Sequence, residues 1–346
     1  MSFSQKILDW YSLNKRSLPW RNTTDPYKIW LSEIMLQQTR VAQGTSYYLS
    51  FEKHFPTVFD LANASEEKVL KLWQGLGYYS RARNLHYTAK DIVENYAGQF
   101  PNTYKELIKL KGVGDYTASA IASISFNEQQ AVVDGNVYRV LSRYFGVNLP
   151  INSTKGIKYF KDLASNVMHS SNIRDYNQGI MEFGALQCTP KNPDCNSCPL
   201  NDGCVALQKK LVTTLPIKIN KTKVKNRYFN YLVFIDNNNK TLLKQRTGKG
   251  IWQNLYEFPV LETTEQKVDV KNEYKKIAPN YNTIDILLYN NKPIVHKLSH
   301  QHLHTNFWVL TVDSTLENGI SFSDLEKYPV PVLIADFIKT FKISYF

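Results

Sequence analysis

The 346-residue sequence is long enough for two domains, each with its own apolar core. Hydrophobic residues make up 43% of it and aromatic residues 13%, which excludes an intrinsically disordered chain. No apolar run has the length of a membrane span, and the first residues lack a signal-peptide core. We therefore expect a soluble, cytoplasmic protein.

The net charge of +12 is concentrated in one short segment. Residues 207–227 carry seven basic residues and no acidic one, whereas residues 1–206 and 228–346 have net charges of only +4 and +1. This segment contains Lys218, Lys221, Lys223, Lys225 and Arg227. Such a run is compatible with a polyanionic partner and equally with a solvated linker. We expect residues 207–227 to be a basic linker between two domains.

The chain before this linker has the pattern of a helical domain. Apolar side chains recur at three- and four-residue spacing in residues 30–35, 69–73 and 118–124, which predicts helices there. Glycine and proline residues separate these segments. Residues 1–206 are therefore predicted to form an all-α domain.

The pattern changes after the linker. Apolar runs rich in β-branched and aromatic residues predict strands at residues 228–235 and 307–312, and residues 236–239 are predicted to form a turn. Residues 332–341 are predicted to form a final helix. We expect residues 228–346 to be an α+β domain.

All four cysteines of the chain fall within one window, at Cys188, Cys195, Cys198 and Cys204. With no secretion signal and no further cysteine, a metal site is a better interpretation than disulfides. Four thiolates suit either a structural zinc ion or a 4Fe–4S cluster. Zinc sites usually have two C-x2-C pairs and this window has one, so the spacing favours iron–sulfur.

Residues 107–124 suggest two helices joined by a glycine turn. The first helix is predicted to end near Leu110, the turn is Gly112-Val113-Gly114, and the second helix is predicted to begin around Asp115. Glycine permits positive φ and lets another backbone come close. Amides next to a helix N-terminus can hold a phosphate, and such contacts position a protein on DNA without reading sequence.

Six ordered motifs within residues 18–204 carry a family resemblance. The motifs are LPWR (18–21), SEIMLQQTRV (32–41), WQGLGYYSRARNL (73–85), GVGDYTASAI (112–121), VVDGNVYRV (132–140) and MEFGALQCTP (181–190). With them the chain resembles the adenine DNA glycosylase (MutY) family of the helix-hairpin-helix, endonuclease III superfamily. The resemblance implies one 4Fe–4S cluster per chain, double-stranded DNA as the partner, no membrane partner, a monomer, and a location in the bacterial cytosol in association with the nucleoid.

Breaking an N-glycosidic bond requires an acid for the leaving base and negative charge near the sugar. Glu33 follows Ile29 and Trp30 on a predicted helix, so apolar neighbours would raise the pKa of its carboxyl. A surface glutamate on an amphipathic helix is the alternative, and the resemblance favours the acid. Asp134 fits a helix N-cap, and by resemblance it also stabilises the cationic sugar. By the same resemblance, Asn136 helps to orient the acid and water.

Tyr116 distinguishes two kinds of glycosylase. Bifunctional relatives have a lysine at this position, whose amine forms a Schiff base. A phenol cannot form an imine, and Lys111 lies before the hairpin turn. We expect a monofunctional glycosylase that leaves the abasic site intact.

Other motif residues are expected to contact DNA or the flipped base. By resemblance, Gln38 and Tyr78 intercalate near the oxidised guanine with support from Thr39 and Leu76. Trp20, Arg21 and Glu182 match positions of the base pocket, although Trp20 could simply pack in the core and Tyr78 could be one more core aromatic residue.

Residues 228–346 resemble the MutT-like (Nudix-like) domain that ends proteins of this family. The glutamate run R-E-x-x-E-E of a working Nudix hydrolase is missing after Gly250, so no pyrophosphohydrolase activity is expected. Ser299 and His300 match the loop that recognises oxidised guanine, with Leu298 in place of the usual phenylalanine. The four histidines between 296 and 304 could suggest zinc, but the alternation favours a strand end or loop.

These observations predict a monofunctional adenine DNA glycosylase that removes adenine opposite 8-oxoguanine or guanine in base-excision repair. Three alternatives stay open: a bifunctional glycosylase for damaged pyrimidines, a non-catalytic DNA-binding protein with the same fold, and a Nudix hydrolase. Tyr116 argues against the bifunctional glycosylase, and the presence of both Glu33 and Asp134 argues against a non-catalytic protein. The missing glutamate run argues against a Nudix hydrolase.

Overall fold

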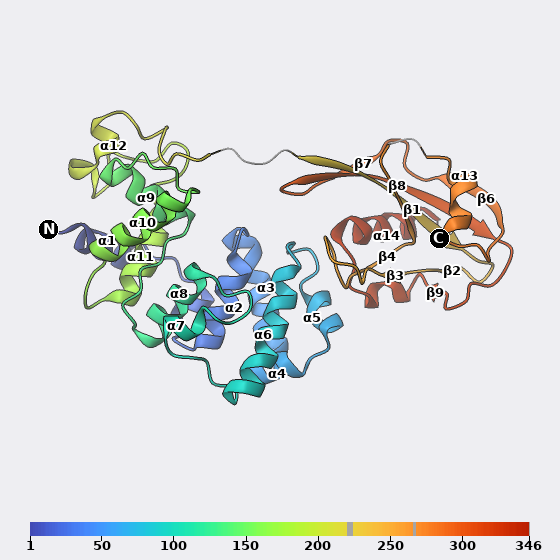
Figure 1. The fold of residues 1–346 in the computed structure, drawn as a ribbon, viewed down its shortest axis with the longest axis horizontal. Helices are drawn as coiled ribbons and strands as arrows, with labels where there is room; N and C mark the ends of the chain where they lie inside the picture. The colour runs from blue at the N-terminus through green and yellow to red at the C-terminus, as the bar shows by residue number, and fades with distance from the viewer. Residues whose placement is uncertain (220–223, 266–267, 346) are drawn as a thin grey trace. The chain divides into compact units, whose positions relative to one another are not determined.

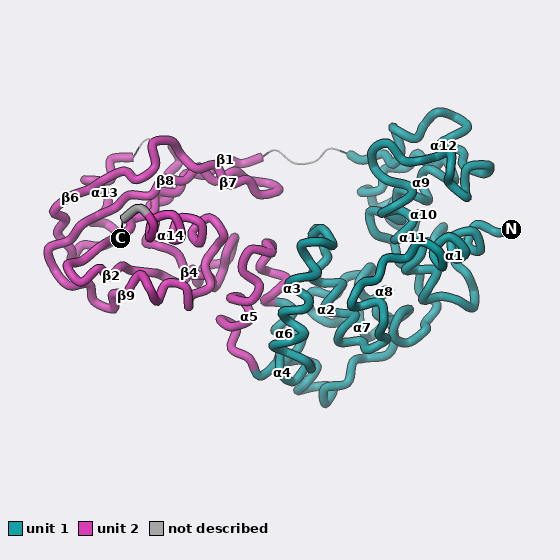
Figure 2. The backbone as a smooth tube through the Cα atoms, turned by 180° about the vertical axis from the view of Figure 1, so that it is seen from behind, with its two compact units in different colours: residues 1–63, 84–220 teal, residues 64–83, 221–346 magenta. Residues whose placement is uncertain are grey.

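The computed structural model describes residues 1–219, 224–265 and 268–345. The chain forms two compact units, which Figure 2 distinguishes by colour. Unit 1 comprises residues Met1–Asn63 and Asn84–Asn220, and unit 2 comprises Ala64–Arg83 and Lys221–Phe346. Residues 64–83 precede the cysteine window by more than a hundred positions, yet they cluster with the C-terminal part of the chain.

Unit 1 is helical (Figure 1). Its α-helices, with α6 beginning in unit 2, are α1 (Phe3–Asn14), α2 (Pro26–Leu36), α3 (Val41–His54), α4 (Val58–Asn63), α6 (Ser80–Tyr96), α7 (Tyr104–Leu107), α8 (Asp115–Phe126), α9 (Gly135–Phe145), α10 (Thr154–Val167), α11 (Ile173–Leu186) and α12 (Val205–Gln208). Short 3-10 turns lie at Pro19–Asn22 and Asn201–Gly203. The helices predicted at residues 30–35 and 118–124 are confirmed within α2 and α8.

A side-chain cap fixes where α2 begins. Asp25 accepts a hydrogen bond from the backbone N–H of Tyr27, and Pro26 occupies the first turn of α2. α2 packs against α3 and α8, while α11 packs against α1, α8 and α9. Apolar residues of α9, α10 and α11 share one core, in which Phe160, Tyr176 and Phe183 are buried. This packing holds α2, α8, α9 and α11 as a frame for the site below.

The first helix of the hairpin ends earlier than the sequence predicted. α7 ends at Leu107 instead of near Leu110. The N–H groups of Lys109 and Leu110 bond to carbonyls three residues back, so the chain tightens into turns after Leu107. The second helix, α8, begins at Asp115 as predicted.

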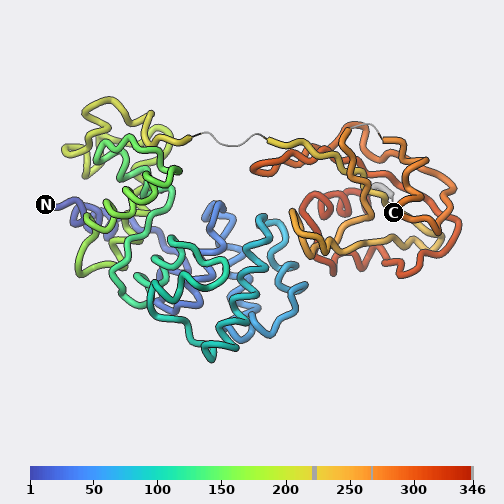
Figure 3. Tube along the Cα trace, viewed as in Figure 1, coloured from blue at the N-terminus to red at the C-terminus, as the bar shows by residue number. Residues whose placement is uncertain are grey.

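Unit 2 is built around two long parallel strands, β1 (Lys225–Ile235) and β8 (Gln301–Val312), which Figure 3 traces side by side. The sheet order is β5-β1-β8-β6, with β7 also paired to β8. Both predicted strands, the turn after Ile235 and the final helix are confirmed. The remaining elements are α5 (Glu66–Leu72), β2 (Lys240–Thr241), β3 (Lys244–Gln245), β4 (Tyr256–Glu257), β5 (Val260–Thr263), α13 (Val270–Glu273), β6 (Thr283–Leu288), β7 (Ile294–Lys297), β9 (Ile320–Ser321), α14 (Val332–Tyr345) and 3-10 turns at Tyr274–Lys276 and Asp324–Lys327.

The core of unit 2 forms where the sheet meets the C-terminal helix. Every residue of β1 from Phe229 to Ile235 is buried, which is typical of a central strand covered on both faces. Phe307 of β8 stacks on Phe337 of α14 with ring centroids 3.9 Å apart. This contact places α14 against one side of the sheet. The helix predicted at residues 332–341 is longer in the structure, where α14 extends to Tyr345.

The basic segment, residues 207–227, overlaps a helix at its start and a strand at its end. α12 extends to Gln208, and β1 begins at Lys225. Arg227 pairs with Glu262 at 2.6 Å, so this cation is part of unit 2. Lys221 and Lys223 lie outside the described residues. Within the part of the chain that the structure describes, no helix combines the length and apolar character needed to cross a membrane.

Candidate active site

A cavity of about 630 Å³ in unit 1 brings most of the expected site residues together. Helices α2, α8, α9 and α11 contribute to its wall. Among the expected residues, its lining includes Trp20, Arg21, Glu33, Gln38, Thr39, Gly114, Tyr116, Asp134, Asn136 and Glu182. These residues are far apart in the sequence, so the fold creates the site.

The Glu33 carboxyl is buried in this cavity. Glu33 lies in the middle of α2, only 7% exposed, and Ile29 of the same helix also lines the cavity. Burial raises the pKa of Glu33 to about 7, with a smaller raising effect from Asp134, while a hydrogen bond from Tyr116 and the charge of Arg21 lower it. Glu33 can therefore hold a proton near neutral pH.

Asp134 is the N-cap of α9. Its Oδ1 accepts hydrogen bonds from the backbone N–H groups of Asn136 and Val137, both at 2.8 Å. Its Oδ2 accepts a third bond from Asn136 Nδ2 at 2.7 Å. Burial raises the pKa of Asp134, and these three bonds oppose that effect by favouring the charged form. The cap thus holds the carboxylate in one orientation at the cavity.

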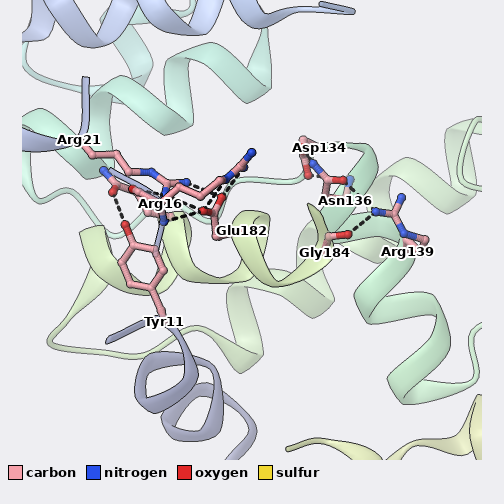
Figure 4. A network of polar contacts seen from close by, with 9 residues as sticks. Tyr11, Arg16, Arg21, Asp134, Asn136, Arg139, Glu182 and Gly184 are labelled. Carbon is pink, nitrogen blue, oxygen red and sulfur yellow. Dashed lines mark hydrogen bonds and ion pairs between the residues drawn. The ribbon is translucent and has the colours of Figure 1, made fainter. Parts of the chain in front are cut away.

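Arg139 connects this cap to the chain around the first cysteine. Its guanidinium donates to Asn136 Oδ1 at 2.8 Å and to the carbonyl oxygen of Gly184 at 2.5 Å, as drawn in Figure 4. Its Nε donates to the carbonyl oxygen of Cys188 at 2.7 Å. Arg139 therefore joins the N-terminus of α9, the end of α11 and the start of the cysteine window.

Glu182 is held by two arginines (Figure 4). Arg16 Nη2 and Arg21 Nη2 both donate to Glu182 Oε2 at 2.6 Å, and the backbone N–H of Arg16 donates to Oε1 at 3.0 Å. Burial alone would raise the pKa of Glu182, but the hydrogen bonds from Arg16 and Arg21 lower it to about 2. Arg21 and Glu182 were expected to bind the base, and in this structure they bind each other.

Sequence reasoning missed Arg16. It lies before the LPWR motif, outside a regular element, and no periodic pattern marks it. Arg16 lies just after the end of α1. The packing of α1 against α11 brings it to Glu182, which is 166 positions away in the sequence. Trp20, in contrast, is buried and packs edge-on against Tyr48 while also lining the cavity.

Tyr116 occupies the second position of α8 and faces Glu33. Burial raises the pKa of Tyr116 well above its ordinary value, and the negative charge of Glu33 adds to this effect. Its hydroxyl also lies 3.3 Å from the sulfur of Met181. Among the described residues that line the cavity there is no lysine. Lys111 Nζ lies instead 3.9 Å from the ring centroid of Tyr87.

The two hairpin glycines have different reasons to be glycine. Gly112 has φ +80°, and an added Cβ would lie 2.8 Å from Asn84 Cβ. Gly114 has ordinary extended backbone as the N-cap of α8, and a Cβ there would meet open space. The fold itself therefore requires glycine at 112, while at 114 the open side leaves room for another backbone to approach the helix N-terminus.

Gln38 and Tyr78 share an unusual backbone. Gln38, at the end of α2, has φ +56°, and Tyr78 has φ +48°. Gln38 is exposed and Tyr78 is 45% exposed, whereas neighbouring Leu76 is buried. Thr39 is half-buried and its hydroxyl lies 3.4 Å from the carbonyl oxygen of Gln37. Left-handed backbone at a residue other than glycine is strained and typical of functional positions.

The four cysteines surround a second, small cavity of about 30 Å³. Cys188, Cys195, Cys198 and Cys204 all line it. Arg143 Nη1 lies 3.4 Å from Cys188 Sγ. Burial raises the pKa of the Cys195 and Cys198 thiols. Four sulfur ligands with a cation beside them fit a cluster of iron and sulfide, whose net charge is negative when bound to thiolates.

In unit 2, Ser299 and His300 lie in the exposed turn between β7 and β8. Ser299 Oγ lies 3.1 Å from His300 Nδ1, and the backbone of Leu298 pairs with Gln301 across the turn. His304 stacks on Tyr228, and His296 lies against Trp252. Each of these histidines therefore has its own neighbour. Within the described ranges, no three His, Cys, Asp or Glu residues form a group suited to a single metal ion.

Three family models match this chain. One described as HhH-GPD superfamily base excision DNA repair protein matches residues 31–163, and a NUDIX domain model matches residues 230–340. A model of the iron–sulfur binding domain of endonuclease III matches residues 188–204. Together with four thiols around one cavity, this match identifies the cysteine window as the site of a 4Fe–4S cluster.

Curated relatives match most of the chain. An adenine DNA glycosylase of Buchnera aphidicola subsp. Schizaphis graminum is 38% identical over 311 residues, which cover 87% of this chain and 85% of the relative. An adenine DNA glycosylase of Arabidopsis thaliana is 36% identical, and the match covers 82% of this chain and 50% of the relative. One of Homo sapiens is 43% identical over 60% of this chain and 40% of its own.

Solved structures match the helical part. A thermostable thymine-DNA glycosylase has a TM-score of 0.56 and 32% identity, covering 60% of this chain and 95% of that chain. A non-covalent endonuclease III–DNA complex has a TM-score of 0.51 over 61% of this chain and 99% of that chain. At 23% identity the latter likeness concerns the fold alone.

Proposed function

The chain belongs to the adenine DNA glycosylase family of base-excision repair enzymes, and we propose that it removes adenine mispaired with 8-oxoguanine or guanine in duplex DNA. The observation that carries this proposal is the buried Glu33 carboxyl, with a pKa of about 7, in a cavity wide enough for a flipped base. We also propose that the enzyme works as a monomer in the cytoplasm.

In the proposed mechanism, Glu33 donates its proton to a ring nitrogen of the flipped adenine. The base then leaves as a neutral molecule, and positive charge develops on the sugar. Asp134, held by three hydrogen bonds, stabilises this charge from the same cavity. Asn136, fixed by Arg139, orients the water that completes hydrolysis. Cys188, Cys195, Cys198 and Cys204 would hold the 4Fe–4S cluster, and protein side chains carry the steps described above.

We propose that the enzyme is monofunctional. Schiff-base chemistry needs an unprotonated amine next to the sugar. Tyr116 occupies the expected amine position, and Lys111 is held over Tyr87. The product is therefore an intact abasic site.

Gln38 and Tyr78 are proposed to fill the gap that the flipped base leaves in the duplex. Their exposure and left-handed backbone support this role. Ser299 and His300 are proposed to recognise the oxidised guanine from the exposed β7–β8 turn. No pyrophosphohydrolase activity is proposed for unit 2, because the glutamate run R-E-x-x-E-E of a working Nudix hydrolase is missing after Gly250.

Single-turnover excision tests the proposal. Duplexes with adenine opposite 8-oxoguanine, guanine or cytosine are compared, and Glu33→Gln is expected to slow excision by about 10²- to 10⁴-fold. Release that ignores the opposite base would contradict the substrate assignment. Nicking of abasic DNA as fast as adenine release would contradict the monofunctional assignment.

Thymine is a second candidate substrate. The 32% identity to a thymine-DNA glycosylase favours it, but that match covers 60% of the chain, whereas the match to an adenine glycosylase covers 87%. A duplex with thymine opposite guanine belongs in the same experiment. Thymine release faster than adenine release would reverse the assignment.

A further inference from the structure

The segment 64–83, which carries Tyr78, is attached to the C-terminal part of the chain. Lys71 Nζ donates to the carbonyl oxygen of Tyr328 at 3.1 Å, and the backbone N–H of Val330 donates to Gln74 Oε1 at 3.1 Å. Lys71 Nζ also donates to Gln74 Oε1 at 3.2 Å. Residues 328–330 lie two positions before α14, which begins at Val332. Figure 2 accordingly gives α5 the colour of unit 2.

Two further bonds attach the two ends of the segment. Near its start, Glu66 Oε1 accepts a hydrogen bond from Asn254 Nδ2 at 2.5 Å. At its end, Arg83 Nη1 donates to the carbonyl oxygen of Gln253 at 3.0 Å. Residues 253 and 254 follow Trp252, which is buried. The segment is thus held at its start, middle and end by two loops of unit 2.

The same segment fixes the backbone next to Tyr78. Trp73, which is fully buried between Lys71 and Gln74 in the sequence, donates from Nε1 to the carbonyl oxygen of Gly77 at 3.0 Å. Arg81 donates to that carbonyl at 3.1 Å, and its guanidinium lies 5.2 Å from the Trp73 ring and 5.5 Å from the Tyr78 ring. Only a few bonds therefore separate the attachment point from the strained residue.

We propose that Lys71 and Gln74 are positioning residues, which fix the Tyr78 loop to the C-terminal domain. The residue expected to enter the base stack would then move together with the domain expected to recognise oxidised guanine. This inference rests on the proposed function, because it assigns Tyr78 the role of filling the duplex. It adds a role for the C-terminal domain in base excision that does not require that domain to touch the lesion.

A double-mutant cycle separates positioning from simple packing. Gln74→Leu removes the acceptor of Val330 and Lys71, while Gln74→Glu keeps two acceptor oxygens at the same place. Tyr78→Ala removes the ring, and the cycle combines it with Gln74→Leu. The full-length proteins are compared by single-turnover excision of adenine opposite 8-oxoguanine, by duplex affinity and by melting temperature.

We expect Gln74→Leu to slow excision by about 5- to 30-fold, because Val330 N–H and Lys71 Nζ both lose their acceptor on Gln74. Gln74→Glu should retain most of the wild-type excision rate. In the Tyr78→Ala background, Gln74→Leu should have little further effect, because its action passes through Tyr78. A simple stability role would instead lower the melting temperature and give multiplied rate losses.

Lys71→Met gives an independent test of the same attachment, should Gln74→Leu fail to fold. Its matched control is Lys276→Met, which removes an exposed ion pair with Glu273 in the same unit. Lys71→Met should slow excision while Lys276→Met leaves it unchanged.

Three outcomes would overturn the inference. These are a wild-type rate in both Gln74→Leu and Lys71→Met, rate losses that multiply in the double mutant, and equal losses in Lys71→Met and Lys276→Met. If Tyr78→Ala alone leaves excision unchanged, the proposed role of Tyr78 is also wrong. The single Tyr78 variant therefore distinguishes failure of the proposed function from failure of this inference.

Discussion

Glu33 is expected to weaken the fold at the pH at which it loses its proton. Burial raises the pKa of Glu33 from its ordinary 4.5 to about 7. The gap of about 2.5 corresponds to about 3 kcal/mol, at about 1.4 kcal/mol for each pKa unit. Because Glu33 is only 7% exposed, little of this is screened by solvent.

The sign follows from which state binds the proton. Between about pH 4.5 and 7, the folded chain keeps a proton on Glu33 that the unfolded chain has lost, so stability falls as pH rises. The favourable contribution is complete below about pH 4.5 and is lost above about pH 7. Glu33→Gln introduces an amide that does not titrate. We therefore expect this variant to exceed wild type in stability by up to about 3 kcal/mol at pH 8.

Urea unfolding of both proteins from pH 5 to pH 8.5 measures this difference. The matched control is Glu94→Gln, which makes the same change at an exposed position of α6 and should give no pH-dependent difference. The wild-type excision rate should also fall above about pH 7 as the protonated acid disappears. A stability difference between wild type and Glu33→Gln that stays constant across this pH range would refute the reasoning.

Four other perturbations have expected outcomes. Arg139→Leu removes the bonds to Asn136 and to the carbonyls of Gly184 and Cys188, and should slow single-turnover excision by at least about tenfold; a wild-type rate would exclude Arg139 from positioning Asn136. Gly112→Ala should destabilise the chain by about 1–3 kcal/mol in thermal unfolding, because φ is +80° and Asn84 leaves no room. Gly114→Ala should keep the wild-type melting temperature but bind duplex DNA more weakly, and normal binding would remove the hairpin from the DNA interface. Cys198→Ser should reduce the absorbance near about 400 nm of anaerobically prepared protein, and an unchanged spectrum would argue against its role as a cluster ligand.

Local patterns in the sequence predicted the elements that are richest in apolar residues. The helix around Glu33 and the apolar strand at residues 228–235 gave correct elements, because residues 29–35 of α2 and 229–235 of β1 are buried throughout. The helical spacing also placed Glu33 among apolar neighbours, and its carboxyl is indeed buried. Here a local pattern was sufficient because α2 supplies part of its own surroundings.

The contacts that join distant segments could not be predicted in this way. Arg16 reaches Glu182 across 166 positions, and Lys71 reaches Tyr328 across 257. Neither cation belongs to a periodic pattern or a spaced motif that would indicate its partner. Their roles depend on how helices and loops pack, which hydrophobic periodicity does not specify.

The backbone at Gln38 and Tyr78 shows what stability alone does not explain. A left-handed conformation at a residue other than glycine costs about 1–3 kcal/mol, and glycine would avoid most of that cost. Both side chains are exposed, so burial of apolar surface does not offset the strain. A fold optimised only for stability would favour glycine at these two positions. Ala97 and Lys210 are also exposed with left-handed backbone, so the conformation alone does not assign a role. We propose insertion into duplex DNA for Gln38 and Tyr78 because they also match positions of the family motifs.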